Sequence, residues 1–292
     1  KRQLLCLGRV NIILPEGLHM SPAASHNIDD YESLLVALQS VLGVVVSESQ
    51  RSCLLARVEP LLSDYGLDSL VSLADSLQGQ QADKIRTSVL EAISKRESGW
   101  SISPSILNVL HKYVFAQLKD KAKIWIVGCG PGQLAYSVAM ELAEYENRTG
   151  ETKDVQLFAT DNLAADIQQA ESASYSTHQL TELSDGYKKL YTAAGDTSSS
   201  SIIKDKIRQR VKFSQCDLTE DFQSLGKMDL IICAEVLVYF SNGVKAGILK
   251  QFFSLLNTGG IFLTANNQVV TPFTDSFERV DHAAGVFYRQ KK

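Results

Sequence analysis

The sequence predicts an α/β fold in which a small helical N-terminal domain precedes a sheet domain, and three observations indicate it. Apolar residues recur with helical spacing from residue 29 to about residue 121. From residue 123 onward, short apolar runs alternate with helical segments, which is typical of a parallel sheet covered on both faces. Polar residues interrupt this alternation. We therefore expect an N-terminal extension at 1–28, a helical domain at 29–102, and a sheet domain at 103–292 with an insertion at about 176–209.

Four helical patterns make up the expected N-terminal bundle. In the first, Leu34, Leu38 and Leu42 recur at i, i+4. The second has a capping box at 47–50 and Gly66 at the expected C-cap, with Pro60 predicting a kink or break and Arg51 and Arg57 expected on a solvated face. Two more patterns follow at 68–78 and 82–94, and Ser103 with Pro104 predicts the start of another helix at the entry to the sheet domain.

The strand predictions follow the apolar runs in the second half of the chain. They cover 123–128, 155–161, 210–218, 228–240 and 260–267, with a closing hairpin at 277–292. Helical segments separate most of these runs, as crossover connections between parallel strands require. The polar stretch at 195–201 is expected to be mobile, and the insertion around it to dock a protein instead of lining the ligand pocket.

Composition limits the classes of function. A net charge of −4 and a pI of 5.8 give no field that would attract nucleic acid. The five cysteines and five histidines lack metal-ligand spacing, so we expect reduced thiols and no metal. No apolar run approaches the roughly 20 residues of a membrane span, so a cytoplasmic protein without membrane insertion is expected. The chain does not begin with Met and contains His19 followed by Met20, so residues 1–20 are treated as partly non-native and no function rests on them.

Three glycines lie where the first predicted strand of the sheet meets its helix. Gly128, Gly130 and Gly132 form either a cradle for a ligand or simply a tight turn. The next strand ends in Asp161, whose carboxylate can accept hydrogen bonds from ribose hydroxyls. Because position 133 is Gln and not a further glycine, a ligand without phosphates fits better than a dinucleotide. S-adenosylmethionine is such a ligand.

Two further strand ends supply candidate residues. Asp217 can bond the adenine amino group while Leu218 packs on the ring, although Asp217 can equally be the N-cap of a helix. Glu235 and Tyr239 are expected to end the central strand above the crevice where open α/β sheets bind ligands. Burial of Tyr239 in the core is the alternative.

With these residues identified, the chain resembles the chemotaxis receptor methyltransferase family, CheR, over residues 30–290. The resemblance rests on "YSVAM", "ATD", "VKFSQCDL", "DLIICAEVLVYF" and "LKQFFSLLNTGGIFL" in order. It implies a Rossmann-like class I methyltransferase sheet with a small inserted subdomain, and S-adenosyl-L-methionine as cofactor with S-adenosyl-L-homocysteine as product. It also implies that Tyr239 is catalytic and faces the methyl group. The expected cofactor-binding residues are Gly128, Cys129, Gly130, Gly132, Asp161, Asn162, Asp217, Leu218 and Glu235.

The resemblance implies methylation of glutamate side chains in the cytoplasmic domain of a receptor, but several positions depart from the family pattern. Gln133 and Leu134 replace an acidic pair, Ala234 and Glu235 follow Cys233 where the family has Arg and Asn, and 266–268 also differ. Ile102 stands where a catalytic arginine is expected, and Arg96 lies six residues earlier. Glu235 is expected to engage the cofactor ammonium instead. Two alternatives stay open: a regulator that binds cofactor without catalysis, and a methyltransferase for another substrate.

Overall fold

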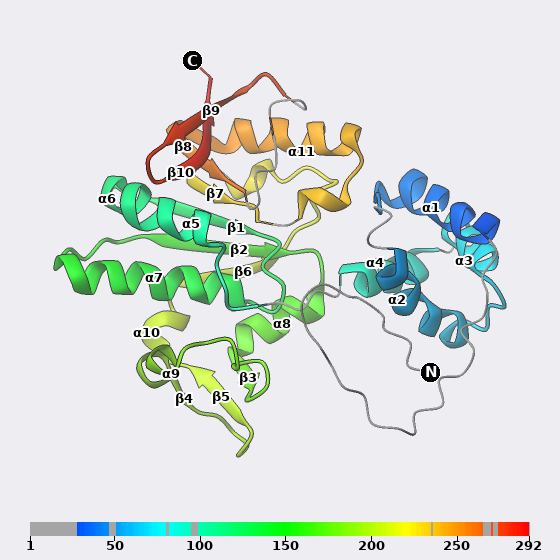
Figure 1. Cartoon of the computed structure of the whole chain (residues 1–292), viewed down its shortest axis with the longest axis horizontal. Helices are drawn as coiled ribbons and strands as arrows, with labels where there is room; N and C mark the ends of the chain where they lie inside the picture. The colour runs from blue at the N-terminus through cyan, green and yellow to red at the C-terminus, as the bar shows by residue number, and fades with distance from the viewer. Residues whose placement is uncertain are drawn as a thin grey trace, which may run out of the picture.

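A computed structural model describes residues 28–46, 51–79, 82–94, 99–234, 236–264, 270 and 274–291. Helices come first in the chain and the sheet follows (Figure 1). The predicted capping box at 47–50 and the expected extension lie outside the described residues.

Four N-terminal helices form a bundle with its own apolar core. These are α1 (Ile28–Leu42), α2 (Arg51–Asp64), α3 (Leu70–Gln78) and α4 (Asp83–Ser94). The leucines at i, i+4 in α1 do face inward, because Leu34 and Leu38 have no exposed surface. The expected break at Pro60 is absent: α2 runs through this residue, which lies on the exposed side of the helix where the freed carbonyl can bind water. At the end of α2, Gly66 takes the left-handed φ of 64° that a C-cap glycine adopts.

Within the described residues, the main sheet contains seven strands in the order β6-β2-β1-β7-β8-β10-β9. The first five are parallel, and β10 pairs antiparallel with both β8 and β9. This confirms the predicted parallel sheet and its closing hairpin. The strands are β1 (Lys123–Val127), β2 (Gln156–Asp161), β6 (Val211–Gln215), β7 (Met228–Ile232), β8 (Leu256–Leu263), β9 (Phe277–His282) and β10 (Gly285–Gln290).

Both faces of the sheet are covered. Along β1, Ile124 and Ile126 belong to one apolar core, whereas Trp125 and Val127 belong to another. The alternation follows from the two-residue period of a strand and accounts for the continuous apolar run in the sequence. The first core lies under α5 (Pro104–Val109), the π-helical turn η2 (Leu110–Val114), α6 (Phe115–Gln117), α7 (Gln133–Thr149) and α8 (Ala164–Ser172); the second lies under α11 (Asn242–Leu255) and the 3-10 turn η3 (Gln223–Leu225).

The central strand is shorter than the sequence suggests. β7 ends at Ile232, and the following apolar residues form a 3-10 turn, η4 (Leu237–Tyr239), instead of a continued strand. The last contact with β8 is the Cys233 N–H donating to the Leu263 carbonyl at 2.9 Å. Val236 and Leu237 then bury their side chains in the second core, so the apolar run is satisfied without sheet pairing. The prediction that Glu235 and Tyr239 end this strand is therefore wrong.

The polar interruption forms a small structure of its own, which lies below the main sheet in Figure 1. It contains β3 (Ser174–Ser176), α9 (Asp185–Tyr191), β4 (Thr192–Ala194), β5 (Ser200–Ile203) and α10 (Asp205–Arg208). The three strands pair antiparallel in the order β3-β5-β4. The turn at 195–199 carries the hydrogen bond from the Gly195 N–H to the Ser200 carbonyl, 3.0 Å. The small inserted subdomain expected from the resemblance is present.

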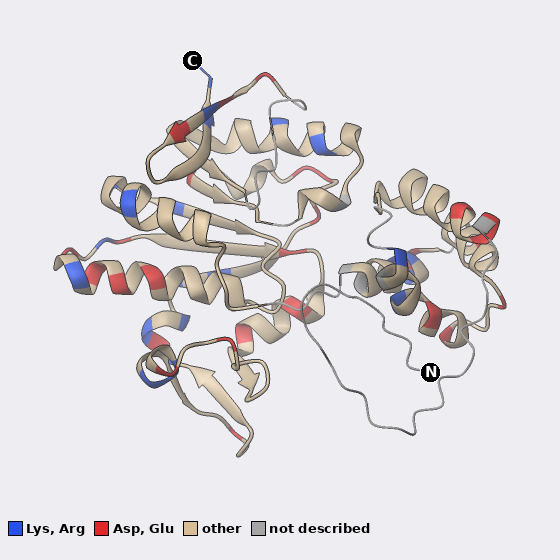
Figure 2. Cartoon of the chain, viewed as in Figure 1, with Lys and Arg blue, Asp and Glu red and all other residues tan. Residues whose placement is uncertain are grey.

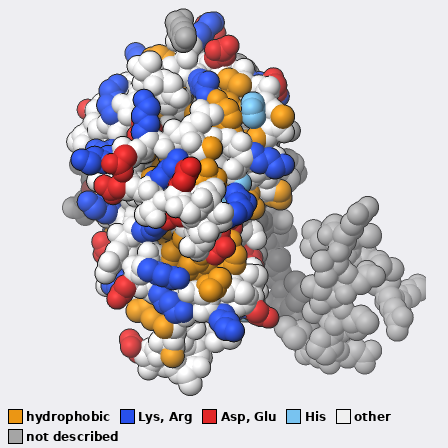
Figure 3. All heavy atoms as spheres, turned by 90° about the vertical axis from the view of Figure 1, so that its left-hand side faces the viewer, with side chains coloured by type: hydrophobic (Ala, Val, Ile, Leu, Met, Phe, Trp, Pro, Cys, Tyr) orange, Lys and Arg blue, Asp and Glu red, His pale blue; other side chains and the backbone are white. Residues whose placement is uncertain are grey.

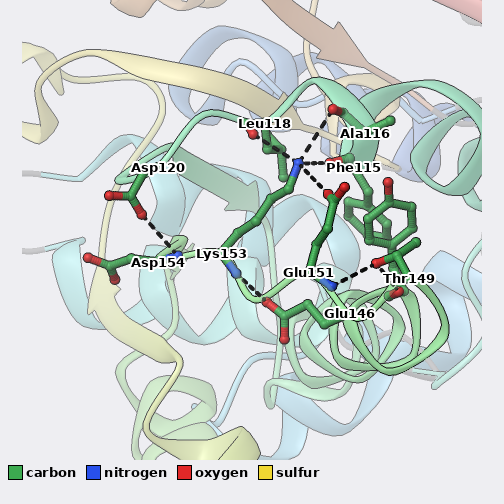
Figure 4. Close-up of polar contacts among 10 residues, drawn as sticks. Phe115, Ala116, Leu118, Asp120, Glu146, Thr149, Glu151, Lys153 and Asp154 are labelled. Atoms are coloured by element: carbon green, nitrogen blue, oxygen red, sulfur yellow. Dashed lines mark hydrogen bonds and ion pairs between the residues drawn. The ribbon is translucent and has the colours of Figure 1, made fainter.

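Lys153 lies just before β2, at the end of the sheet where the parallel strands begin, and binds the C-terminal end of α6. Its Nζ donates to the carbonyls of Phe115 and Leu118 at 2.9 and 3.1 Å, just where α6 ends (Figure 4). A cation at a helix C-terminus is favoured by the helix dipole.

Lys and Arg are mixed with Asp and Glu along the ribbon (Figure 2) and also on the face seen in Figure 3.

Candidate active site

A cleft opens at the carboxyl ends of the parallel strands, between the sheet and the N-terminal helices. Its volume is about 1790 Å³. Open α/β sheets bind their ligands at this end of the strands. The residues that line it include seven of the predicted cofactor residues, Gly128, Cys129, Gly130, Asp161, Asn162, Asp217 and Leu218.

The glycine loop, residues 128–132, follows β1 and takes a conformation that only glycine adopts easily. Gly128, Gly130 and Gly132 have φ angles of 66°, 51° and 95°. A Cβ at Gly128 would lie 2.0 Å from Val236 Cγ2, and one at Gly132 would lie 2.8 Å from Ala170 Cβ. The absence of side chains at these two positions is thus explained by the turn and its packing. Gly132 does not line the cleft, whereas Gly130 does.

Asp161 lies at the end of β2 and joins three segments. Its Oδ2 accepts a hydrogen bond from the Gly130 N–H at 2.9 Å, and its Oδ1 accepts one from the Leu163 N–H at 3.2 Å. The carboxylate therefore holds the glycine loop against the start of α8. An ionised carboxylate has about four lone-pair sites, so two backbone bonds leave acceptor capacity toward the cleft.

Cys129 and Asn162 contribute mainly backbone. The Cys129 N–H donates to the Thr160 carbonyl at 3.0 Å, and its own carbonyl accepts from Gly132 at 3.0 Å. Burial, and then the carboxylates of Asp161 and Asp166, raise the pKa of the Cys129 thiol well above its usual range, so this thiol stays protonated. The Asn162 carbonyl accepts a hydrogen bond from the Gln215 side chain at 2.8 Å, which ties the end of β2 to β6.

Asp217 and Leu218 follow β6 and differ in burial. Asp217 is exposed, and its Oδ1 accepts from both the N–H and the hydroxyl of Thr219, at 2.8 and 2.7 Å. It therefore stabilises a turn and not the N-terminus of a helix, which corrects that alternative. Leu218 packs in the second core with 7% of its surface exposed. Beside them, burial and then the charges of Asp217 and Glu220 raise the pKa of the Cys216 thiol to about 11.

The predicted catalytic residue lies in η4. Tyr239 is the last residue of this turn, seven positions beyond the end of β7. Its side chain and the whole of Glu235 lie outside the described residues. The backbone after Tyr239 is fixed to the N-terminal helices, since Phe240 pairs with Val44 and the Ser241 N–H donates to the Gly43 carbonyl at 2.8 Å.

Part of the cleft wall is apolar where the resemblance implies an arginine. Ile102 is 9% exposed and packs in the first core while lining the cleft. Leu134 and Ala234, two other departures from the family pattern, also line it. Gln133 is 1% exposed at the start of α7. Arg96 and residues 266–268 lie outside the described residues.

The basic residues that the described cleft lining offers are Arg57 and Arg86, both from the N-terminal helices. Arg57 Nη1 donates to the Ile93 carbonyl at 2.9 Å, and Arg86 Nε donates to the Leu77 carbonyl at 2.8 Å. Each thus binds the C-terminal end of a neighbouring helix. Arg51 lies over the Tyr31 ring at 4.2 Å. The expectation that Arg51 and Arg57 form a solvated face is wrong, because both guanidinium groups contact the bundle.

The inserted segment also lines the cleft, which sequence reasoning missed. Gln179 and Glu182 are part of its wall. Glu182 Oε2 accepts from the Trp100 N–H at 3.0 Å, and the Gln179 carbonyl accepts from Trp100 Nε1 at 2.7 Å. These contacts join residues about 80 positions apart, so no local sequence pattern predicts them. The prediction that the insertion stays out of the pocket is corrected.

The described residues also bear on other kinds of function. They contain no group of three or more His, Cys, Asp or Glu side chains arranged to hold a metal ion. Among the described helices, none combines the length and apolar character that a membrane crossing requires.

Comparison with known proteins assigns the chain to a family. Residues 97–286 match the family described as CheR methyltransferase, SAM binding domain. The chain belongs to the CheR methyltransferase family. A chemotaxis protein methyltransferase from Vibrio anguillarum is 30% identical over 268 residues, which are 90% of this chain and 97% of that protein. Chemotaxis protein methyltransferase 1 from Pseudomonas aeruginosa is 29% identical over 271 residues, 90% of this chain and 98% of the relative.

Among solved structures, a TehB-like SAM-dependent methyltransferase from Corynebacterium glutamicum aligns with 75% of this chain and 99% of its own. Its sequence identity is 13% and its TM-score 0.39. Family membership makes this chain an S-adenosylmethionine-dependent methyltransferase with a class I sheet, as predicted.

Proposed function

We propose that this CheR family member methylates glutamate side chains in the cytoplasmic domain of a chemotaxis receptor. The observation that carries the proposal is the Asp161 carboxylate, held beside the bare Gly130 backbone in a cleft at the strand ends. That arrangement suits a ribose next to a close-packed backbone. Relatives that align along 97–98% of their own length are chemotaxis protein methyltransferases, which supports a protein of chemotaxis as the acceptor here.

The residues present fit S-adenosylmethionine. Asp161 would accept hydrogen bonds from its ribose hydroxyls, and Leu218 would pack on its adenine while Asp217 bonds the amino group. Gly128, Cys129, Gly130 and Asn162 would border it through backbone and small side chains, with Gly132 shaping the loop behind them. Asp217 Oδ1 is engaged with Thr219, so its other oxygen is the candidate acceptor. We assign Glu235 to the cofactor ammonium as part of the same proposal.

The chemistry asks little acid or base catalysis of this chain. S-adenosylmethionine supplies a methyl group on a positively charged sulfur, which an ionised carboxylate can attack in line without prior loss of a proton. The protein's contribution is then to position the acceptor and to exclude water. Ile102, Leu134 and Ala234 give the cleft an apolar wall, which helps to exclude water. Tyr239 is proposed to orient the acceptor carboxylate.

The cleft has room for a protein acceptor. Pockets for small molecules usually measure roughly 300–1,000 Å³. The volume of about 1790 Å³ therefore exceeds what one cofactor needs. The N-terminal helices form the outer wall, and the contact between Val44 and Phe240 fixes them beside Tyr239. A receptor segment that enters between the helices and the sheet would reach this end of the cleft.

A second candidate is a methyltransferase with a different acceptor. The observation that favours it is the apolar Ile102 in the cleft wall, together with Arg57 and Arg86 already donating to helix carbonyls. Among the described residues, the cleft therefore lacks an arginine that projects toward an anionic substrate without another contact from its guanidinium. A neutral acceptor would suit this wall better than a carboxylate.

The test measures binding and transfer separately. Calorimetry with S-adenosylhomocysteine reports the cofactor site, and transfer of labelled methyl to purified receptor cytoplasmic fragments reports the acceptor. We expect binding together with base-labile methyl ester on the fragments. Binding without transfer to receptor glutamate would reject the proposed acceptor; transfer to another acceptor would support the second candidate, and no transfer at all a regulatory role.

Tyr239→Phe tests the catalytic assignment. Because the hydroxyl is proposed to act on the reacting groups, we expect the variant to lose about tenfold or more in kcat while its affinity for S-adenosylhomocysteine changes less than about threefold. Single-turnover methyl transfer measures the first and calorimetry the second. A variant that turns over at the wild-type rate would place Tyr239 away from the reaction centre.

A further inference from the structure

The glycine loop has an anchor that comes from the inserted subdomain. Within the sheet domain, Gly128 and Cys129 donate to the Thr160 carbonyl, Gly130 donates to Asp161, and Gly132 donates to Cys129. The carbonyl of Pro131, at the apex of the loop, instead accepts a hydrogen bond of 2.6 Å from the hydroxyl of Tyr175. Tyr175 belongs to β3, the first strand of the insertion.

Tyr175 is held firmly in place. Its side chain is 1% exposed. Its ring meets the Trp100 ring edge-on at 4.9 Å and the Tyr136 ring at 6.3 Å. Antiparallel pairing with Ser201 of β5 fixes its backbone. Burial raises the pKa of the Tyr175 hydroxyl well above its usual range, so it remains a donor at all physiological pH values.

Tyr175 packs closely against the glycine loop. A Cβ on Gly132 would lie 3.0 Å from the Tyr175 hydroxyl, so the loop backbone passes directly against it. On the other side, Trp100 N–H and Nε1 are bound by Glu182 and Gln179 of the insertion, and the Trp100 carbonyl accepts from Ser137 of α7 at 2.7 Å. The insertion thus fixes both the glycine loop and the segment that leads to Ile102.

We propose that Tyr175 is a positioning residue for S-adenosylmethionine: its hydroxyl holds the Pro131 carbonyl and thereby the cofactor-binding conformation of the glycine loop. The inference rests on the cofactor site of the proposed function but not on the identity of the acceptor. It makes the inserted subdomain a structural part of the cofactor site. A ligand that displaces β3 would therefore change cofactor affinity.

Tyr175→Phe removes the hydroxyl and leaves the aromatic contacts. Tyr191→Phe is the matched control, because Tyr191 is equally buried in the insertion and its hydroxyl donates to Glu144 of α7, away from the loop. We expect S-adenosylhomocysteine to bind Tyr175→Phe about 3- to 10-fold more weakly, the effect of losing one hydrogen bond, and to bind Tyr191→Phe within about twofold of wild type. Calorimetry well below the melting temperature of each variant gives these affinities.

Amide hydrogen exchange supplies a second readout. In Tyr175→Phe the peptides that contain Gly130 and Gly132 should exchange faster, whereas in Tyr191→Phe they should not. Wild-type affinity and loop exchange in Tyr175→Phe, even with a lower melting temperature, would overturn the inference by showing a purely structural role. Absence of S-adenosylhomocysteine binding to the wild type would overturn it too, whereas intact binding without receptor methylation would reject only the proposed acceptor.

Discussion

The two walls of the cleft are built in different ways. The wall proposed to bind the cofactor, called the cofactor wall below, is made of the glycine loop with Asp161, Asp217 and Leu218. These residues lie at the end of β2 or in short segments that follow β1 and β6. The wall proposed to face the acceptor, called the acceptor wall below, is made of Ile102, Arg57, Arg86 and Phe240. It combines two helices of the N-terminal bundle with segments before β1 and after β7. The residues of the first wall lie at the strand ends of one sheet, with Tyr175 of the insertion supporting the loop, and the second wall forms only when the N-terminal bundle packs beside the sheet domain.

This difference separates what each wall can tolerate. In the cofactor wall, each polar group already makes a backbone contact that supports the fold, as Asp161 does with Gly130 and Leu163. In the acceptor wall, Ile102 contributes only apolar packing, and the two arginines bind helix ends. Substitutions in the cofactor wall should therefore disturb the fold and cofactor affinity together, whereas substitutions in the acceptor wall should disturb packing and acceptor choice while changing cofactor affinity less.

The largest expected effect is Gly128→Ala. The new Cβ would sit 2.0 Å from Val236 Cγ2 at a φ of 66°, so both overpacking and left-handed strain apply. We expect a loss of about 2–5 kcal/mol in the free energy of unfolding, from about 1–2 for the backbone and about 1–3 for the clash. Denaturant unfolding of the full chain measures it.

Gly150→Ala is the matched control for that loss. Gly150 ends α7 with a φ of 73° and has open space where its Cβ would lie. Only the backbone cost of about 1–2 kcal/mol should remain. Equal losses in the two variants would mean that Val236 does not press on the glycine loop, and the cofactor wall would be less tightly built than the comparison holds.

An intermediate effect is expected for Asp161→Ala, which removes an acceptor from the loop and from the proposed ribose site. S-adenosylhomocysteine affinity should fall by about 1–3 kcal/mol, the range for leaving buried partners unsatisfied. Asp217→Ala, at an exposed residue, should cost about 0.5–1.5 kcal/mol. Calorimetry ranks the two. If Asp161→Ala binds as wild type does, the ribose assignment fails, and a larger loss in Asp217→Ala would reverse their order within the cofactor wall.

Much of the cofactor wall could be predicted from the sequence because its chemistry lies where apolar runs end. The ends of β1, β2 and β6 are marked by Gly128, Asp161 and the pair Asp217 and Leu218. A strand period of two and a polar residue at the end of the run suffice to place them at one edge of a parallel sheet. No residue spacing in the sequence predicts the second role of Asp161, which is to accept a hydrogen bond from the loop backbone.

The acceptor wall and the contacts of the insertion could not be predicted from the sequence in the same way. The run 228–240 is predominantly apolar on both sides of Ile232, so hydrophobicity alone could not show that β7 stops at Ile232 and that Val236 enters the core from a turn. The contacts of Trp100 with Gln179 and Glu182 depend on tertiary folding across about 80 residues. No local signal reveals a neighbouring helix end, so the sequence predicts a solvated position for charged side chains such as Arg57.

The smallest expected effect concerns Cys216, which lines the cleft at the end of β6 and so reports on the cofactor wall alone. Its pKa is raised to about 11, mainly by burial, so the unreactive thiol predominates below that pH. The rate of alkylation by iodoacetamide at this residue, followed by mass spectrometry, should therefore rise about tenfold per pH unit from pH 8 to pH 10, where an ordinary thiol of pKa about 8.5 would already level off.

Saturating S-adenosylhomocysteine should slow the reaction, whereas a receptor fragment alone should not. A rate that levels off near pH 9 would show a solvated thiol, and protection by the receptor fragment alone would mean that the two walls are not separate binding surfaces.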